Sequence, residues 1–289
     1  MNCRLCYIIA VMSKIRLIAS DLDGTLLRDG AQCLRPETCN LIKALKQKGI
    51  RFLPSSGRQF DNLTRLFEPV RNEIVYLCQN GASAWADGKI LFQEFMDHTA
   101  ADRLIDEVRK LNDTEIMVSD FSVCYVSDTN DAFYHLVHDV VGMRTERVSD
   151  LHAHSGNCTK ISLYNEGGNF DLAYWRKQFG DSFTVVPGGE QWLDIMANHI
   201  NKGTAFQQLL EWLQISPEET VVFGDNLNDL EIMKMAGLAI TVPTGVPAIQ
   251  ELADVICDRV ETVLKEILDG KDQIEDWKGA GEWTLHSIM

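Results

Sequence analysis

The sequence predicts an α/β protein in two parts, a parallel-sheet core and an α+β unit inserted into it. Apolar runs of strand length alternate with amphipathic stretches of helix length towards both ends of the chain. Such strand–helix–strand order implies right-handed crossovers and a parallel sheet. Between about residues 84 and 190 the strand candidates are shorter and follow an antiparallel pattern. We therefore expect a discontinuous core at 13–83 and 191–270, an inserted unit at 84–190, an N-terminal extension at 1–12 and a C-terminal tail at 271–289.

The elements of the core follow from hydrophobic periodicity and the residues that interrupt it. Residues 37–48 carry Leu41, Ile42 and Leu45 at helical spacing, and Gly49 ends this helix. The other elements expected in the first core segment are strands at 15–19, 50–53 and 73–78 and a helix at 60–67. Those expected in the second segment are strands at 220–223 and 238–242 and helices at 203–213, 228–235, 247–253 and 261–268.

The inserted unit has a different pattern. Two short strand candidates, 115–118 and 122–126, stand on either side of a brief polar break. Further strands are expected at 159–164 and 183–187, with helices at 100–111, 131–141 and 170–179. Antiparallel strands grouped with separate helices are typical of an α+β unit.

The composition limits the partners and the compartment. The 289 residues include 27 Lys and Arg against 42 Asp and Glu, a net charge of −15. Such a surface repels nucleic-acid backbones and anionic membranes, so we expect neither as a partner, whereas local positive groups still permit a small phosphorylated metabolite. Eight cysteines without regular spacing indicate reduced thiols and a cytoplasmic protein. The apolar run at 5–11 is too short to span a bilayer, and Cys3-x-x-Cys6 alone is a weak metal signal.

The residues that carry chemistry begin with Asp21-Leu22-Asp23-Gly24-Thr25, directly after the first strand. Side chains two apart in an extended chain point the same way, so Asp21 and Asp23 are expected to face one space. That space lies at the carboxyl edge of the sheet, where open α/β folds bind ligands. Two adjacent carboxylates need a cation, a shared proton or solvent. An acidic turn that caps a helix is the alternative interpretation.

A second acidic segment, Gly224-Asp225-Asn226-Leu227-Asn228-Asp229, follows another apolar strand. Alone it would be interpreted as a turn that caps the next helix. Two acidic groups at the carboxyl ends of parallel strands instead suit Mg²⁺, which takes few carboxylates together with waters and a substrate phosphate.

Two further segments offer groups for an anion. Ser55-Ser56-Gly57-Arg58 follows the second strand and provides a hydroxyl and turn N–H groups, although a simple helix cap would look the same. Lys202, in Asn201-Lys202-Gly203-Thr204, stands at a helix start, where its charge opposes the helix dipole unless it serves an anion. A solvated surface lysine is the alternative.

In order along the chain, DLDGT, SSGR, NKG and GDNLND resemble the four motifs of the haloacid dehalogenase (HAD) superfamily. The closest resemblance is to its Cof-type phosphatases, which carry a large α/β cap between the second and third motifs. Asn80-Gly81-Ala82 and Leu193-Asp194-Ile195 also resemble segments of that group. The resemblance covers roughly residues 15–254 and implies a Rossmann-like HAD core with an α+β cap domain. It also implies a Mg²⁺-dependent phosphatase of small phosphorylated metabolites, such as sugar phosphates or phosphorylated cofactors.

The resemblance implies a role for each motif residue. Asp21 matches the nucleophile that forms an aspartyl phosphate, and Asp23 matches the general acid and base. The expected ligands of Mg²⁺ are Asp21, the backbone carbonyl of Asp23, Asp225 and Asp229. The groups expected to bind the phosphoryl oxygens are Ser56, Gly57, Lys202 and Asn228.

Alternatives stay open at this level. A phosphomutase or phosphotransferase would use the same nucleophile, and a non-catalytic ligand-binding protein could keep the fold, although all four motifs are intact. Residues 243–247 lack the Gly-Asn-Ala turn that Cof-type proteins usually carry, and this departure at Gly245 could alter metal geometry or substrate access. The sequence predicts neither the substrate, nor the cap residues that choose it, nor the oligomeric state.

Overall fold

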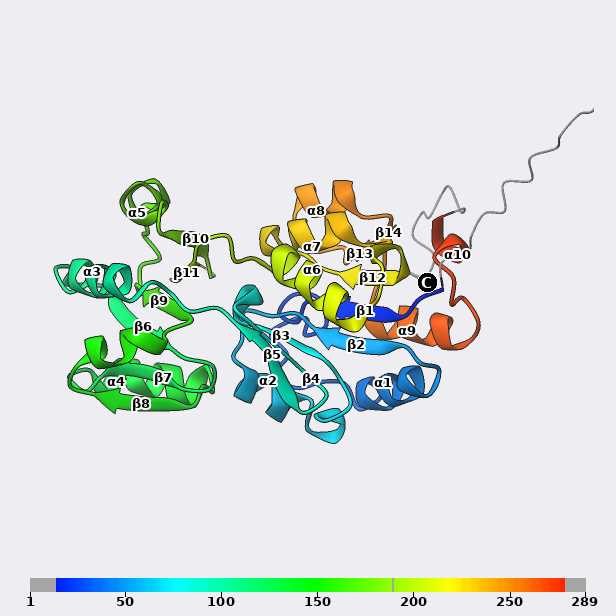
Figure 1. The fold of residues 1–289 in the computed structure, drawn as a ribbon, viewed down its shortest axis with the longest axis horizontal. Helices are drawn as coiled ribbons and strands as arrows, with labels where there is room; N and C mark the ends of the chain where they lie inside the picture. Colours follow the sequence, from blue (N-terminus) through cyan, green and yellow to red (C-terminus); the bar gives the residue numbers. More distant parts are fainter. Residues whose placement is uncertain (1–13, 189, 279–289) are drawn as a thin grey trace, which may run out of the picture.

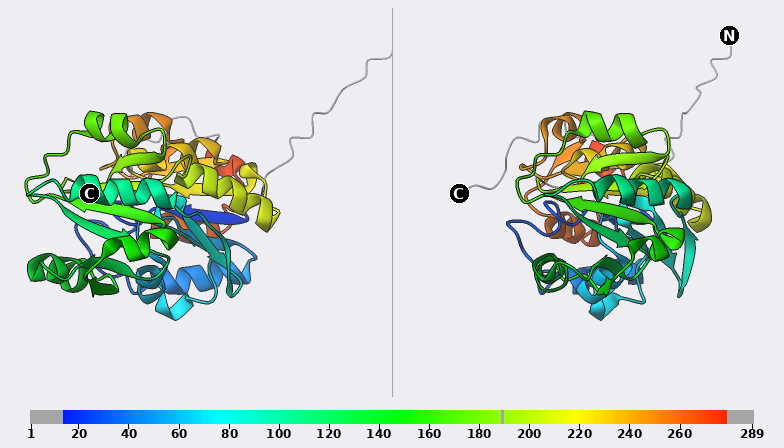
Figure 2. Two further views of the ribbon diagram at one scale, coloured as in Figure 1. Left: turned by 60° about the vertical axis from the view of Figure 1, so that its left-hand side comes forward. Right: turned by 90° about the vertical axis from the view of Figure 1, so that its left-hand side faces the viewer.

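The computed structural model of the chain describes residues 14–188 and 190–278. They form a core and an inserted unit, which is drawn in green in Figure 1 and lies in front of the core in the right-hand view of Figure 2. The extension expected at 1–12, with Cys3-x-x-Cys6, and residues 279–289 of the expected tail lie outside the described residues.

The core is built on a five-stranded sheet in the order β14-β13-β12-β1-β2, in which every neighbouring pair is parallel. The strands are β1 (Leu17–Ser20), β2 (Arg51–Pro54), β12 (Thr220–Phe223), β13 (Leu238–Thr241) and β14 (Val255–Ile256). β1 and β12 are buried along their whole length, as in parallel sheets that are covered on both faces. The sheet confirms the predicted α/β class and adds β14, which is too short for periodicity to detect.

Helices cover both faces of this sheet (Figure 1). The alternation of side chains along β1 explains why: Ile18 belongs to one hydrophobic cluster, and Leu17 and Ala19 belong to another. The Ile18 cluster includes side chains of α1 (Thr38–Gln47), α2 (Phe60–Leu66), α9 (Val260–Leu268) and α10 (Glu275–Lys278). The other cluster includes those of α6 (Lys202–Leu213), α7 (Leu230–Met235) and α8 (Pro247–Leu252). Within the described ranges, no helix is long and apolar enough to cross a membrane.

The strand expected at 73–78 is shorter and pairs differently. β3 (Tyr76–Cys78) forms an antiparallel three-stranded sheet with β4 (Ser83–Ala86) and β5 (Lys89–Gln93). A parallel bridge between Ser55 and Leu77 links β3 to the end of β2. The expected start of the inserted unit at residue 84 therefore falls inside β4, and Ala84 and Ala86 pack in a core cluster. We assign this hairpin to the core.

The inserted unit contains a six-stranded sheet in the order β10-β11-β9-β6-β7-β8. Its strands are β6 (Glu115–Ser119), β7 (Cys124–Ser127), β8 (Thr145–Val148), β9 (Lys160–Tyr164), β10 (Phe183–Pro187) and β11 (Trp192–Ala197). Its α-helices are α3 (His98–Val108), α4 (Asp131–His135) and α5 (Leu172–Phe179). β11 pairs with β9 and β10 and therefore belongs to the inserted unit. The chain returns to the core only after β11, whereas the expected boundary at residue 191 lies before it. The inserted unit therefore lies between β5 and α6.

Polar and aromatic contacts join the two units. The side-chain amides of Gln59 and Gln79 both donate to the carbonyl of Asp120, at 3.2 and 2.8 Å. Beside them the rings of Phe60 and Phe121 stack with centroids 4.8 Å apart. The inserted unit is therefore closed against the core in this structure.

The first residues of the expected tail belong to the core. Gln273 forms an antiparallel bridge with Lys14, and Ile274 and Trp277 are buried in the Ile18 cluster. The indole N–H of Trp277 donates to the carbonyl of Lys271 at 3.2 Å. The fold therefore continues past residue 270 because these apolar side chains cover the α9 side of the sheet.

Replacing Trp277 by Ala is expected to lower the free energy of unfolding by about 3–5 kcal/mol, because it opens a cavity in the core. The Trp277 side chain is 5% exposed, whereas Trp212, the matched control, is 41% exposed. Urea denaturation of both Trp→Ala variants measures the difference. Equal, small losses would show that residues 271–278 are dispensable.

Candidate active site

Loops from three neighbouring strands meet at one edge of the core sheet because the strands run parallel. Asp21 directly follows β1, and Asp225 and Ser56 come shortly after β12 and β2. β1 lies between β12 and β2, so the Asp21 loop is the central one. The motifs that are far apart in the sequence therefore come together at the carboxyl edge, where α/β folds bind ligands.

The ammonium group of Lys202 is buried between two carboxylates. Its Nζ donates to Asp21 Oδ1 at 2.5 Å and to Asp229 Oδ1 at 2.6 Å, and the side chain is 0% exposed. Burial opposes the charge, but the two carboxylates outweigh it and raise the pKa of Lys202 above its ordinary value. The side chain of Asn201 caps helix α6, because its Oδ1 accepts a hydrogen bond from the backbone N–H of Thr204. This cap fixes Lys202 at the first helical position. Lys202 is therefore a buried cation of the site and not a solvated surface lysine.

Asp21, Asp225 and Asp229 form a carboxylate cluster, with one oxygen of each within 4.8 Å of the others. Burial raises the pKa of Asp21 well above its ordinary value, and Asp229 adds to the rise while Lys202 opposes it. Burial likewise raises the pKa of Asp225. When all three are ionised, Lys202 neutralises only one of the charges. The remaining charge and the oxygen ligands fit one divalent cation such as Mg²⁺.

Asp229 is held through both of its oxygens. Oδ1 accepts from Lys202, and Oδ2 accepts from the backbone N–H groups of Asp225 and Asn226, each at 3.1 Å. Asp225 is held through one oxygen, because Thr25 Oγ1 donates to its Oδ1 at 2.6 Å. Asp229 therefore organises the acidic loop, and it has fewer free lone pairs for a cation than Asp225 has.

Gly24 lets the first acidic loop approach the second. Its φ is +102°, and a Cβ atom there would lie 2.3 Å from Asp225 Oδ2. The turn around it is closed by a hydrogen bond from Leu27 N to Leu22 O at 2.7 Å. Only glycine combines this backbone conformation with the space that the Asp225 carboxylate occupies.

The turn at 243–247 braces the acidic loop although it lacks the usual asparagine. Val246 N donates to the carbonyl of Asp225 at 2.8 Å, and Thr241 Oγ1 donates to the carbonyl of Gly224 at 2.8 Å. Gly245 allows the close approach, since a Cβ atom there would lie 2.5 Å from Thr241 Oγ1. Backbone and threonine groups therefore support Asp225 in this chain.

Asp23 lies apart from the carboxylate cluster. Its side chain is 57% exposed, and Arg58 holds both oxygens, with Nη2–Oδ1 at 2.5 Å and Nε–Oδ2 at 2.9 Å. The chain turns after Asp21, so simple strand alternation does not place Asp23 next to Asp21. Sequence reasoning missed the pairing with Arg58. The only sequence signal for this pairing was the arginine at the end of SSGR.

The remaining residues expected to bind phosphate surround Asn80. Ser56 is buried, and its Oγ accepts from Arg58 N at 3.1 Å. Gly57 packs so closely that an added Cβ would lie 3.2 Å from the Asn80 side chain. Asn228 is exposed, and its Nδ2 donates to Asn80 Oδ1 at 3.3 Å. The NGA turn therefore joins the SSGR loop to the acidic loop, a role that the motif alone did not reveal.

A cavity of about 380 Å³ lies between the core and the inserted unit. Its polar lining includes Asp23, Gly57 and Arg58 from the core and Lys160, Ser162 and Asp194 from the inserted unit. Its apolar lining includes Met117, Val140, Val141, Met143 and Trp192, all from the inserted unit. The cavity is large enough for a small metabolite, and Asp23 faces it.

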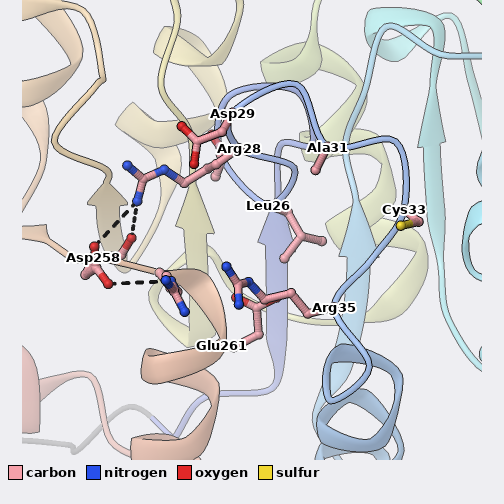
Figure 3. Close-up of a pocket in the computed structure, with 10 residues that line it drawn as sticks. Leu26, Arg28, Asp29, Ala31, Cys33, Arg35, Asp258 and Glu261 are labelled. Carbon is pink, nitrogen blue, oxygen red and sulfur yellow. Dashed lines mark hydrogen bonds and ion pairs between the residues drawn. The ribbon is translucent and has the colours of Figure 1, made fainter.

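A second pocket, of about 280 Å³, reaches from Thr25 to the start of α9 (Figure 3). It is lined by the cations Arg28, Arg35 and Arg259 and by the acids Asp29, Asp258 and Glu261. Asp258 pairs with Arg28 and with Arg259 at 3.6 Å each. Its charges balance, and it contains none of the three clustered aspartates, so we assign it no part in the site.

The family model of haloacid dehalogenase-like hydrolases matches residues 18–267. The chain belongs to this family. The match includes the core segments that carry Asp21, Ser56, Lys202 and Asp225 and the whole inserted unit, which is the cap. Membership confirms the resemblance that the four motifs indicated.

Relatives of this hydrolase include named phosphatases. The 5-amino-6-(5-phospho-D-ribitylamino)uracil phosphatase YbjI of Escherichia coli is 26% identical over 82% of this chain and 88% of its own length. YitU of Bacillus subtilis, which is named for the same phosphatase activity, is 26% identical over 84% of this chain and 92% of its own length. A crystal structure from Eubacterium rectale is 28% identical, with a TM-score of 0.80 over 88% of this chain and 99% of that one. These findings support phosphatase activity for this enzyme.

Replacing Gly24 by Ala is expected to lower the hydrolysis of p-nitrophenyl phosphate by about 100-fold or more, because the new methyl group displaces the Asp225 carboxylate. Gly30→Ala is the matched control, since Gly30 also has a positive φ, +73°, but its Cβ would meet nothing within 4 Å. Initial rates and unfolding curves separate the two effects. If both variants lose activity equally, backbone strain alone is the cause.

Proposed function

We propose that this hydrolase is a Mg²⁺-dependent phosphatase that acts on small phosphorylated metabolites through an aspartyl-phosphate intermediate. The observation that carries the proposal is the buried cluster in which Lys202 bridges Asp21 and Asp229 beside Asp225. Phosphoryl transfer requires an in-line nucleophile and positive charge around the transferred oxygens. This cluster offers the nucleophile, one fixed cation and the ligands for a second.

Asp21, Asp225 and Asp229 would hold Mg²⁺, together with the backbone carbonyl of Asp23. The bound ion would neutralise charge on the carboxylates and on the phosphoryl oxygens. Because burial raises the pKa of Asp21, neighbouring positive charge is needed to keep it ionised as a nucleophile. Lys202 supplies a fixed part of that charge.

In the first step an oxygen of Asp21 attacks phosphorus, and the bond from phosphorus to the leaving oxygen breaks. The proton that the leaving oxygen needs comes from the carboxyl group of Asp23, which acts as the general acid. In the second step ionised Asp23 takes a proton from water, whose oxygen attacks the aspartyl phosphate and releases inorganic phosphate and Asp21. Arg58 would orient Asp23 for both transfers, since it contacts both carboxylate oxygens.

The other expected groups would hold the phosphoryl oxygens. Ser56 Oγ, Gly57 N–H and the Lys202 ammonium are the proposed donors, and Asn228 assists through its amide. The closed cap would exclude bulk water while Asp21 is phosphorylated. The named activity of the YbjI and YitU relatives supports a metabolite of the phosphorylated sugar or cofactor type as substrate.

Replacing Asp21 by Asn is expected to reduce phosphate release from p-nitrophenyl phosphate by at least about 1,000-fold, because the variant has no nucleophile. Asp113→Asn, at an exposed position of the cap, is the control. Phosphate release is measured with a single monoester and no acceptor alcohol, in the presence of Mg²⁺. Unchanged turnover of the Asp21 variant would overturn the proposed mechanism.

Removing divalent cations with a chelator is expected to reduce turnover by at least about 100-fold, and Mg²⁺ in excess is expected to restore it. Mg²⁺ should also raise the midpoint of thermal unfolding, because it binds only the folded cluster. Asp225→Asn should shift both effects to higher Mg²⁺ concentration, whereas Asp258→Asn, outside the cluster, should not. A chelated enzyme that keeps its activity would contradict the metal assignment.

A further inference from the structure

The cap contains a buried ion pair that the proposed chemistry does not use. Lys160 Nζ donates to Asp194 Oδ2 at 3.0 Å, and Ser162 Oγ donates to Asp194 Oδ1 at 2.6 Å. The three residues are 4%, 6% and 1% exposed. They are neighbours because β9 and β11 pair antiparallel with Ser162 opposite Asp194. A buried ion pair costs desolvation and is weak evidence for a stabilising role.

The pair lies on the sheet face that is turned towards the core. The intervening residues Ile161, Leu163 and Ile195 pack in the cap's main hydrophobic cluster, so the alternate side chains project from the opposite face. Lys160 Nζ there donates to the carbonyl of Gly57 at 3.3 Å, across the boundary between cap and core. The cap lysine therefore reaches the loop whose Ser56 and Gly57 are the proposed phosphate donors.

Lys160 retains hydrogen-bonding capacity in the cavity. An ammonium group has three N–H donors, and Asp194 and Gly57 accept from two of them. Among the residues that the structure describes, no acceptor takes the third. Lys160, Ser162 and Asp194 all line the cavity that contains Asp23, the proposed proton donor to the leaving group. A buried, oriented donor beside the leaving group can bind an oxygen on it.

The cavity lining is mixed in polarity. Its polar part is formed by the cap ion pair and by Asp23 and Arg58 of the core. Its apolar wall includes Met117, Met143 and Trp192. A leaving group that matches this lining has hydroxyl groups as well as apolar or flat surface.

We propose that Lys160 is a specificity-determining residue that donates a hydrogen bond to a hydroxyl near the phosphate, which selects phosphate monoesters of polyol chains. This inference rests on the proposed phosphatase function and assigns the substrate class to that same site. Asp194 is then a positioning residue that aims the ammonium group, and Ser162 holds Asp194.

The test compares two substrates with the same five-carbon chain, ribitol 5-phosphate with hydroxyls and n-pentyl phosphate without them. For the unchanged enzyme, kcat/KM should be higher for ribitol 5-phosphate. Lys160→Met should reduce this preference by about 10- to 100-fold, the range for a lost hydrogen bond to a charged group. The loss should be seen mainly in KM. Lys177→Met, at an exposed position of helix α5, is the matched control and should keep the preference.

Thermal unfolding separates a binding role from a structural one. If Lys160→Met does not fold because Asp194 is left unpaired, the double variant Lys160→Met/Asp194→Asn removes both buried charges and should show the same loss of preference. An equal loss with both substrates, or no loss with either, would overturn the role of Lys160 while leaving the phosphatase function intact. Absence of phosphate release from both substrates by the unchanged enzyme in Mg²⁺ would overturn the phosphatase function itself, and this inference with it.

Discussion

The site depends on one buried cation, the ammonium group of Lys202, which is 0% exposed and contacts Asp21 and Asp229 together. Without it, carboxylates from two strands would meet in a buried space with only repulsion between them. With it, one of the negative charges is neutralised, and the remaining charge suits a divalent cation and a phosphate. Because the capping box of Asn201 and Thr204 fixes the start of α6, the position of this cation is set by secondary structure rather than by a mobile loop.

The order of the strands explains how a few residues from distant parts of the sequence form one site. β1 is central between β12 and β2, so the loops after these strands share one edge. The two acidic loops touch only because Gly24 has no side chain where the Asp225 carboxylate lies. Support for Asp225 comes from the backbone of Val246 and the hydroxyl of Thr25, which explains how the loop keeps its shape without the usual Gly-Asn-Ala turn.

The sequence predicted the α/β class and the parallel core because periodicity and strand-end motifs are local signals. It misplaced features that depend on pairing between distant segments. The hairpin of β4 and β5 looks like the start of the cap but pairs with β3, and β11 looks like a return to the core but pairs with β9. Likewise, Lys202 and Asp225 were recognisable by motif, whereas the partner of Asp23 and the role of Asn80 required the fold.

Chemistry and specificity belong to different parts of the molecule. The groups proposed for phosphoryl transfer lie on the core edge, and the motifs that reveal them are fixed in spacing by strand–loop–helix geometry. The groups that line the leaving-group side of the cavity lie mostly on the cap sheet, where alternation along β9 and β11 decides which side chains face the core. Apart from Asp194, which lies in a segment that resembles the Cof-type group, no motif marks the cap residues among them. A polar residue at such a position can change the substrate without changing the reaction. Lys160 is informative for that reason: its burial costs stability, and its contacts reach from the cap to the phosphate loop.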